Sequence, residues 1–86
     1  MAAYSVLFRE SVRKDLDSIP QRDLKRIFIR IGNLASDPRP AGSEKLSGQE
    51  RYRVRQGDYR IIYSIQDFEL TVWVVKVAHR RDAYRS

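Results

Sequence analysis

The stretch of sequence that decides the fold is residues 51–63, which read RYRVRQGDYRIIY. Successive side chains of an extended strand point to opposite faces of the sheet. Three arginines at alternate positions therefore share one face, opposite the face that carries Tyr52 and Val54. These arginines are Arg51, Arg53 and Arg55. The first half of this stretch predicts a strand with one packed face and one strongly basic face.

The residues that follow predict a turn and a second strand. Gln56, Gly57 and Asp58 interrupt the alternation, and Gly57 can take the positive φ that a three-residue hairpin loop usually needs. Residues 59–65 then alternate again, with tyrosines and isoleucines on one face and Arg60 on the other. The whole stretch therefore predicts a β-hairpin with guanidinium groups on one side.

The spacing of these arginines leaves two interpretations open. Charges at alternate positions of a strand lie about 7 Å apart and repel one another unless an anion joins them. This distance is close to the spacing of phosphates along an extended nucleic-acid strand. Arginine is also common on solvated sheet faces, so the pattern fits either an anion-binding face or a solvated face.

The composition limits the classes of protein and of site. The 86 residues suffice for one domain, residues 1–86, and 17 Lys and Arg against 11 acidic residues give a net charge of +6. This excess favours an anionic partner such as nucleic acid or the ribosome. Residues 1–44 carry 8 basic and 6 acidic residues (+2), whereas residues 45–86 carry 9 and 5 (+4). The half that contains the hairpin is therefore the more basic.

Several kinds of site and location are disfavoured by residues that the sequence lacks. The absence of cysteine excludes disulfides, thiolate metal sites and a cysteine nucleophile, and a single histidine argues against a metal site. No apolar run approaches the roughly 18–20 residues of a membrane-spanning helix, and no signal-peptide core is visible. We therefore expect a cytoplasmic protein with no metal, no cofactor and no membrane partner.

The segments around the hairpin predict the other elements. Residues 4–8 alternate as a short strand, Ser11 can cap a helix, and Pro20 opens a second helix at its first turn. The apolar residues of this second helix recur with helical spacing. They are Leu24, Ile27, Phe28, Ile31, Leu34 and Ala35. Two helices so close in sequence form an antiparallel hairpin.

The second half completes the predicted fold. Residues 36–50 form a long loop, residues 66–69 turn the chain, and residues 70–77 form a further strand. One face of this strand is expected to carry Thr71, Trp73, Val75 and Val77. The prediction is an α+β fold: an N-terminal strand, an antiparallel helical hairpin and a three-stranded antiparallel meander. These strands form one mainly antiparallel sheet with the helices packed on one face.

Cations, tyrosines and one imidazole suit phosphoryl chemistry on RNA. The ribose 2′-OH can attack the adjacent phosphate, so the protein mainly aligns the backbone and stabilises charge. Arginine binds phosphate oxygens bidentately, but a pKa above about 12 makes it a poor base. Proton transfer would fall to His79, to Tyr84 or to solvent. Both side chains also have structural alternatives, at a strand end and in packing of the tail.

Four segments together carry a family resemblance. They are residues 38–40 (PRP), 44–48 (EKLSG), 52–63 (YRVRQGDYRIIY) and 77–85 (VAHRRDAYR). With them, essentially the whole chain resembles the RelE toxins of bacterial and archaeal toxin–antitoxin modules, in the RelE/ParE superfamily. The resemblance implies a metal-independent endoribonuclease, an mRNA interferase, that cuts messenger RNA in the ribosomal A site and inhibits translation. The implied partners are the ribosome, its mRNA and a cognate antitoxin, acidic and helix-bearing, that covers the basic face or displaces the tail.

The resemblance also assigns residues by position. It implies that the reaction is carried by Arg53, Arg55, Arg60, Arg80 and Tyr84. In this assignment Arg60 and Arg80 stabilise the phosphorane, and His79 joins Tyr84 as a candidate for proton transfer. Further candidates for RNA binding are Arg51, Lys45 and Arg81.

This chain departs from the family's best-known member at two places. That member has lysines where Arg53 and Arg55 stand, which leaves the general base open and favours His79, because arginine cannot accept the proton. It also has an arginine where Ser47 stands, so we expect one phosphate or ribosomal contact to be lacking here. Two alternatives remain: a ParE-like toxin that inhibits DNA gyrase without nuclease activity, and a non-catalytic RNA-binding module.

Overall fold

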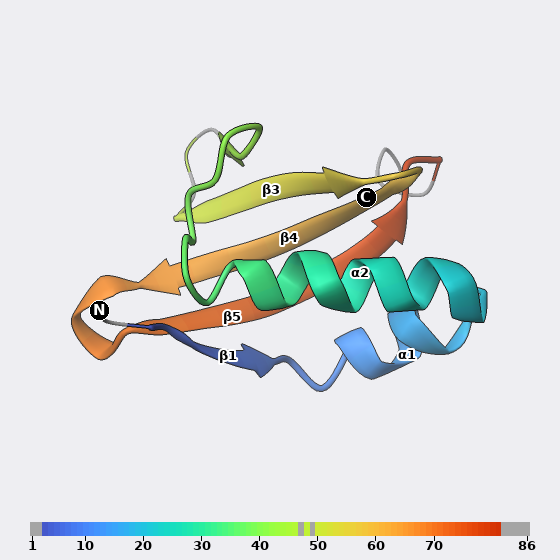
Figure 1. The fold of residues 1–86 in the computed structure, drawn as a ribbon, viewed down its shortest axis with the longest axis horizontal. Coiled ribbons are helices and arrows are strands. Elements are labelled where there is room, and N and C mark those ends of the chain that lie inside the picture. The colour runs from blue at the N-terminus through green and yellow to red at the C-terminus, as the bar shows by residue number, and fades with distance from the viewer. Residues whose placement is uncertain (1–2, 47, 49, 82–86) are drawn as a thin grey trace.

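The computed structural model describes residues 3–46, 48 and 50–81. Its five strands form one sheet in the order β1-β5-β4-β3-β2, and both α-helices lie on the same face of it (Figure 1). The elements are β1 Ser5–Phe8, α1 Val12–Asp17, α2 Gln21–Asn33, β2 Glu44–Lys45, β3 Arg51–Gln56, β4 Tyr59–Gln66, the short 3-10 helix Asp67–Glu69, and β5 Thr71–His79. Only β1 and β5 pair in parallel among these strands. The predicted α+β class and the mainly antiparallel sheet are confirmed.

The β3–β4 hairpin has the predicted faces. Tyr52 pairs with Tyr63 and Val54 with Ile61, and these side chains face the helices. The buried core consists of Val12, Ile19, Ile27, Ile31, Leu34, Val54, Ile61, Tyr63, Val72, Val74 and Val77. The arginines of the hairpin lie on the face away from the helices. Burying valine, isoleucine and tyrosine side chains from both layers is what holds helices and sheet together.

The loop of this hairpin is one residue shorter than predicted. Gln56 still pairs with Tyr59, so only Gly57 and Asp58 form the turn. Gly57 has the expected positive φ, 60°, which the first central position of a tight hairpin turn requires when the turn is of type II′. The turn is short because both strands stay paired up to its edges.

A β-bulge in β5 changes which residues face the core. Ile62 pairs with Lys76 but Tyr63 pairs with Val74, so Val75 is the extra residue. One inserted residue reverses the alternation of all side chains beyond it. Val77 therefore faces the core and is 2% exposed. The prediction that groups Val77 with Thr71 and Trp73 is wrong for this reason, and β5 also continues to His79.

Four details of the N-terminal half and the loop also differ from prediction. Ser11 stands before α1 in a helical conformation and makes no capping hydrogen bond through its side chain. Pro20 precedes α2 rather than standing in its first turn. Phe28 is 44% exposed and contacts the ring of Phe8 edge-on at 6.1 Å, at the margin of the apolar stripe. The predicted loop also contains the two-residue strand β2, because its backbone adds to the edge of β3.

None of the helices in the described part of the chain is long and apolar enough to cross a membrane.

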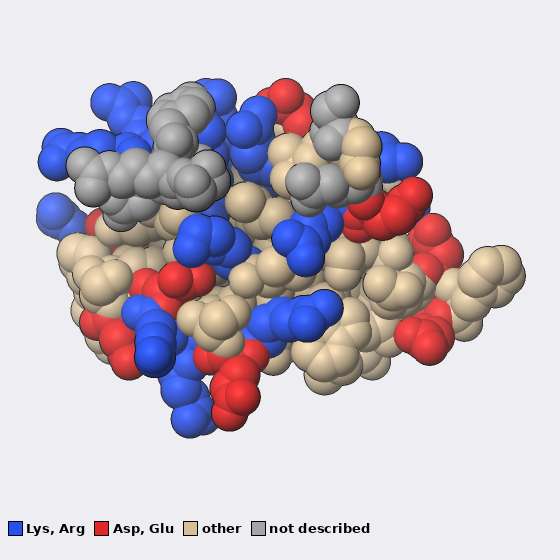
Figure 2. Space-filling model, turned by 180° about the vertical axis from the view of Figure 1, so that it is seen from behind, with Lys and Arg blue, Asp and Glu red and all other residues tan. Residues whose placement is uncertain are grey.

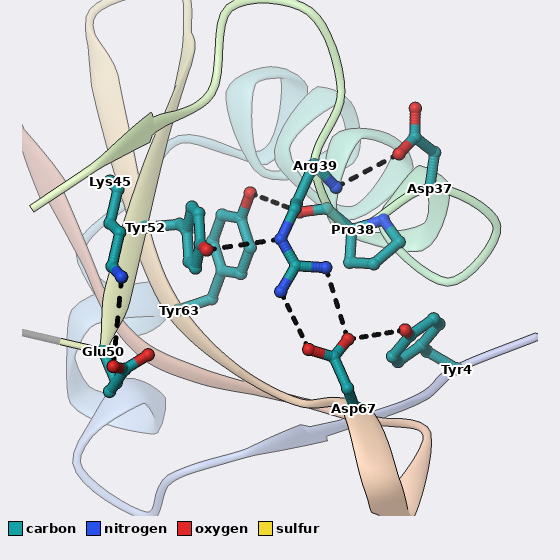
Figure 3. A network of polar contacts seen from close by, with 9 residues as sticks. All are labelled: Tyr4, Asp37, Pro38, Arg39, Lys45, Glu50, Tyr52, Tyr63 and Asp67. Carbon is teal, nitrogen blue, oxygen red and sulfur yellow. Dashed lines mark hydrogen bonds and ion pairs between the residues drawn. The ribbon is translucent and has the colours of Figure 1, made fainter.

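Contacts around Arg39 tie the loop before β2 to the end of the sheet away from the β3–β4 turn (Figure 3). The guanidinium donates to both carboxylate oxygens of Asp67, at 3.2 and 2.9 Å, and Nε donates to the Tyr52 hydroxyl at 3.2 Å. The guanidinium also lies 5.3 Å from the centroid of the Tyr52 ring. The Tyr4 hydroxyl donates to Asp67 at 2.8 Å. We call these four side chains the Arg39 network.

The contacts in this region shift several pKa values. Hydrogen bonds from Arg39 and then from Tyr4 hold the pKa of Asp67 below its usual range, because they stabilise the ionised carboxylate. The hydrogen bond to Asp67 raises the pKa of Tyr4. Burial raises the pKa of Tyr63 to about 12, and its hydroxyl donates to the Pro38 carbonyl at 2.7 Å. The loop is therefore anchored by both charged and neutral contacts.

Candidate nucleic-acid interface

The face of the sheet away from the helices carries the predicted basic side chains. Figure 2 shows Lys and Arg gathered towards the end of this face at which the β3–β4 turn lies. Arg55 and Arg60 stand directly opposite each other on β3 and β4, next to that turn. Ala78 of β5 stands beside Arg60 in the sheet, and both residues are buried.

Three of the predicted arginines come together at this end. Arg55, Arg60 and Arg80 line a hollow of about 240 Å³ with Gly57, Asp58 and Tyr59. We call this hollow the arginine pocket. Arg60 is 6% exposed, whereas the side chain of Arg80 is 71% exposed. Arg60 therefore forms a wall of the pocket, whereas the exposed side chain of Arg80 has room to move towards a ligand.

The turn itself brings Arg80 to the pocket. The backbone N–H of Arg80 donates to the Asp58 carbonyl at 2.7 Å, which holds the end of β5 against the β3–β4 turn. The Arg80 Nε also lies 3.9 Å from Asp58 Oδ1, a loose ion pair between two exposed side chains. Residues far apart in sequence thus meet because β4 and β5 are paired up to their ends.

The other predicted RNA-binding residues lie outside the arginine pocket. Arg53 donates to Glu44 of β2 at 3.2 Å, and Lys45 lies 3.9 Å from Glu50. Arg51 and Arg81 are exposed, at the start of β3 and just after Arg80. We call Arg51, Arg53 and Arg81 the basic margin, whereas Lys45 pairs with Tyr52 and therefore lies on the helix side of the sheet.

His79 lies on the opposite side of the sheet from Arg60. It pairs with Tyr59, and the two rings meet edge-on at 5.3 Å on the helix side. Its Nδ1 accepts the N–H of Arg81 at 3.2 Å, so the neutral ring carries its proton on Nε2. The bulge at Val75 causes this placement, and the structure does not bring His79 together with the arginines. Tyr84 and Ser47 lie outside the described residues.

Two carboxylates near this face had not been singled out from the sequence. Asp58 lines the arginine pocket, and Glu44 pairs with Arg53 beside it. The signal for Asp58 is that it directly follows the turn glycine and stands two residues before Arg60. Glu44 gives no such signal, because it lies in a segment that reads as a loop. No three His, Cys, Asp or Glu side chains are grouped as a metal site would require in residues 3–46, 48 and 50–81.

Comparisons with known proteins show clear relatives over nearly the full chain. A family model described as the ParE toxin of type II toxin–antitoxin system, parDE, matches residues 6–84. Toxin RelG of Mycobacterium tuberculosis is 35% identical to this chain, and the aligned region covers 95% of this chain and 97% of RelG.

Solved structures match equally well. A chain of the toxin–antitoxin complex RelBE2 from Mycobacterium tuberculosis is 32% identical with a TM-score of 0.82, over 95% of this chain and 97% of that one. A chain of the archaeal RelE–RelB complex from Pyrococcus horikoshii is 30% identical with a TM-score of 0.82, over 98% and 99%.

Proposed function

This chain belongs to the RelE family of toxins, within the ParE toxin family of type II toxin–antitoxin systems, and we propose that it is a ribosome-dependent mRNA endoribonuclease. It would cut the message in the ribosomal A site, without metal or cofactor, and so inhibit translation in the cytoplasm. The observation that supports this proposal most is the arginine pocket, which Arg55, Arg60 and Arg80 line together next to the β3–β4 turn. Such a pocket suits a phosphate diester.

In the proposed reaction the RNA supplies its own nucleophile. The 2′-oxygen forms a bond to the adjacent phosphorus and the bond to the 5′-oxygen breaks, which leaves a 2′,3′-cyclic phosphate and a 5′-OH. Arg60 and Arg80 bind the non-bridging oxygens, on which charge develops, and Arg55 holds the phosphate in line. Removing one such donor typically costs a factor of about 10²–10³ in rate.

The basic margin would hold the flanking RNA. Arg53 lies one alternate position from Arg55 on the same face, at a spacing that matches successive phosphates. The pair Arg53–Glu44 is a surface ion pair of low strength, worth about 0–1 kcal/mol, so a phosphate can replace the carboxylate. Lys45 lies on the helix side beside Tyr52, away from this path. Arg51 and Arg81 extend the same surface, and Tyr84 is assigned to the site by resemblance alone.

A cognate antitoxin is the proposed protein partner. One of the two solved relatives belongs to the toxin–antitoxin complex RelBE2, and the other belongs to an archaeal RelE–RelB complex. A chain with a net charge of +6 favours an acidic partner. The antitoxin would block the basic face or displace the tail.

The test is primer extension on a message held on stalled ribosomes, with the same message free of ribosomes in parallel. Wild type and Arg80→Ala are compared, because Arg80 is exposed and its removal leaves the core intact. Cuts made by wild type only on ribosomes, and greatly reduced with Arg80→Ala, support the proposal. Intact message in every lane refutes it.

The family model favours a second candidate, since it is described as a ParE toxin. Resemblance to ParE-type members implies inhibition of DNA gyrase. The same preparation would then block supercoiling by gyrase and leave the message whole. A non-catalytic RNA-binding module would instead show steeply salt-dependent RNA affinity without cuts.

A further inference from the structure

The proposed cleavage needs a group that takes the proton of the attacking 2′-OH. Arginine cannot serve, because it stays protonated throughout the working pH range. His79 lies across the sheet, where its ring packs against Tyr59. Among the described residues, the acceptor is therefore to be sought in the other side chains on the arginine face.

We propose that the carboxylate of Asp58 accepts this proton, an inference that rests on the proposed nuclease function. Among the described residues that line the arginine pocket, Asp58 alone has a side chain that can accept a proton and points away from the core. Tyr59 contributes to the lining, but its ring lies on the helix side. The pocket thus combines three groups for the phosphate with one for the 2′-OH.

The position of Asp58 is set by its backbone. Gly57 precedes it with a φ of 60°, and the Asp58 carbonyl accepts the Arg80 N–H at 2.7 Å. The carboxylate stays 65% exposed, and its Oδ1 lies 3.9 Å from Arg80 Nε, which is too long for a hydrogen bond. An oxygen of Asp58 is therefore open to a ribose hydroxyl while Arg80 binds the neighbouring phosphate.

Charged groups surround Asp58 on several sides. Arg55, Arg60 and Arg80 face it from β3, β4 and the end of β5 in the arginine pocket. On the other side of the turn, Asp23 and Arg26 of α2 line a hollow of about 120 Å³ with Asp58 and Tyr59. The three pocket arginines also attract the phosphate that carries the 2′-OH towards the carboxylate.

The step is balanced without a further reactant. Asp58 takes the proton as the 2′-oxygen bonds to phosphorus, and the electron pair of the breaking P–O5′ bond leaves with the 5′-oxygen. That oxygen takes a proton from water, and Asp58 returns its own proton to solvent. The carboxylate is then ready for the next message.

Glu44 provides a matched comparison. It is a second carboxylate near the same sheet face, but its Oε1 accepts a hydrogen bond from Arg53 and it does not line the pocket. Asp58→Asn and Glu44→Gln each replace a carboxylate by an amide of nearly equal size. Asp58→Glu keeps the carboxylate and displaces it by one methylene.

The experiment measures single-turnover cleavage on ribosome-bound message, and binding of a 2′-O-methyl message that cannot be cut. We expect Asp58→Asn to lower the rate about 100-fold or more, the usual range for loss of a general base, with unchanged binding. Asp58→Glu keeps the carboxylate and should recover part of this rate. Glu44→Gln should cut at nearly the wild-type rate.

Other outcomes overturn the inference. If Asp58→Asn weakens binding as much as it slows cleavage, Asp58 only positions Arg80. If Asp58→Asn cuts at nearly the wild-type rate, or if Glu44→Gln loses as much rate as Asp58→Asn, the proton goes elsewhere. Wild type that makes no cuts refutes the proposed function itself, and the assignment of Asp58 with it.

Discussion

The two ends of the β3–β4 hairpin use arginine in different ways. At one end Arg39 donates hydrogen bonds within the chain, to both carboxylate oxygens of Asp67 and to the Tyr52 hydroxyl. Its guanidinium also lies over the Tyr52 ring. At the other end three arginines share a pocket with one carboxylate, which lies 3.9 Å from Arg80. The Arg55 side chain makes no ion pair with a described residue.

This difference separates a structural arginine from one available to a ligand. Residue type and exposure do not distinguish them, because Arg39 and Arg80 are both exposed. What differs is the strength of the pairing: Arg39 donates two hydrogen bonds to Asp67, whereas Arg80 lies 3.9 Å from Asp58. Exposed guanidinium groups that are only loosely paired, such as Arg80, favour an external anion, whereas the Arg39 network is internally neutralised.

The largest expected effect is at the pocket. Arg80→Ala should lower single-turnover cleavage about 10²–10³-fold, because it removes one donor to the charge of the transition state. Its free energy of unfolding should stay close to wild type, since the side chain is 71% exposed. Arg39→Ala, measured alongside, should cut at nearly the wild-type rate once folded. Equal loss of cleavage in both variants would contradict the proposed division of roles.

Arg60 is less suited to an alanine test, because it is 6% exposed and its removal would also disturb packing.

The next effect is on stability at the anchored end. Tyr63→Phe leaves the Pro38 carbonyl without the hydrogen bond that it accepts at 2.7 Å, which should cost about 1–3 kcal/mol in urea unfolding. The pKa of Tyr63 is raised to about 12 by burial, so the folded state holds this proton more tightly than the unfolded state. Its contribution is complete below pH of about 10 and declines as pH rises towards 12. The free energy of unfolding of Tyr63→Phe should therefore fall less at alkaline pH than that of wild type. An equal fall in both proteins would contradict this role of the Tyr63 hydroxyl.

A smaller loss is expected for Arg39→Ala. It removes the stack on Tyr52 and the hydrogen bond to its hydroxyl, which together should lower the free energy of unfolding by on the order of 1 kcal/mol. Arg39→Lys keeps the charge but not the planar fork, and should recover only part of the loss. Full recovery with lysine would show that charge alone matters at this end.

The smallest effect is the acid dependence of Asp67. Its pKa is lowered in the folded state by the hydrogen bonds from Arg39 and Tyr4. The stabilisation is therefore present above the unfolded pKa of about 3.9 and is lost as pH falls below it, through the folded pKa. Urea unfolding between neutral and acid pH should show a shallower decline for Asp67→Asn than for wild type. If the free energies of unfolding of the two proteins fall in parallel with pH, Asp67 does not contribute to the loss of stability in acid.

The sequence predicted the hairpin and the faces of its residues correctly. Arg55 and Arg60 lie where the alternation places them, because strand period and apolar pattern are local properties. The contacts of Arg39 could not be predicted, since its partner Asp67 lies 28 residues away. Asp58 read only as a turn residue, and its place in the pocket depends on Arg80, which reaches it from the end of β5.

The sequence by itself determined which residues of β3 and β4 face the core and which carry charge on the open face. A residue's neighbours along a strand suffice for that, because burial selects one of two faces. The tertiary structure alone decided the faces beyond Val75, where strand pairing absorbs one extra residue and reverses the alternation. For this reason Ala78 lies beside Arg60 while His79, one residue further, packs on the side of the helices.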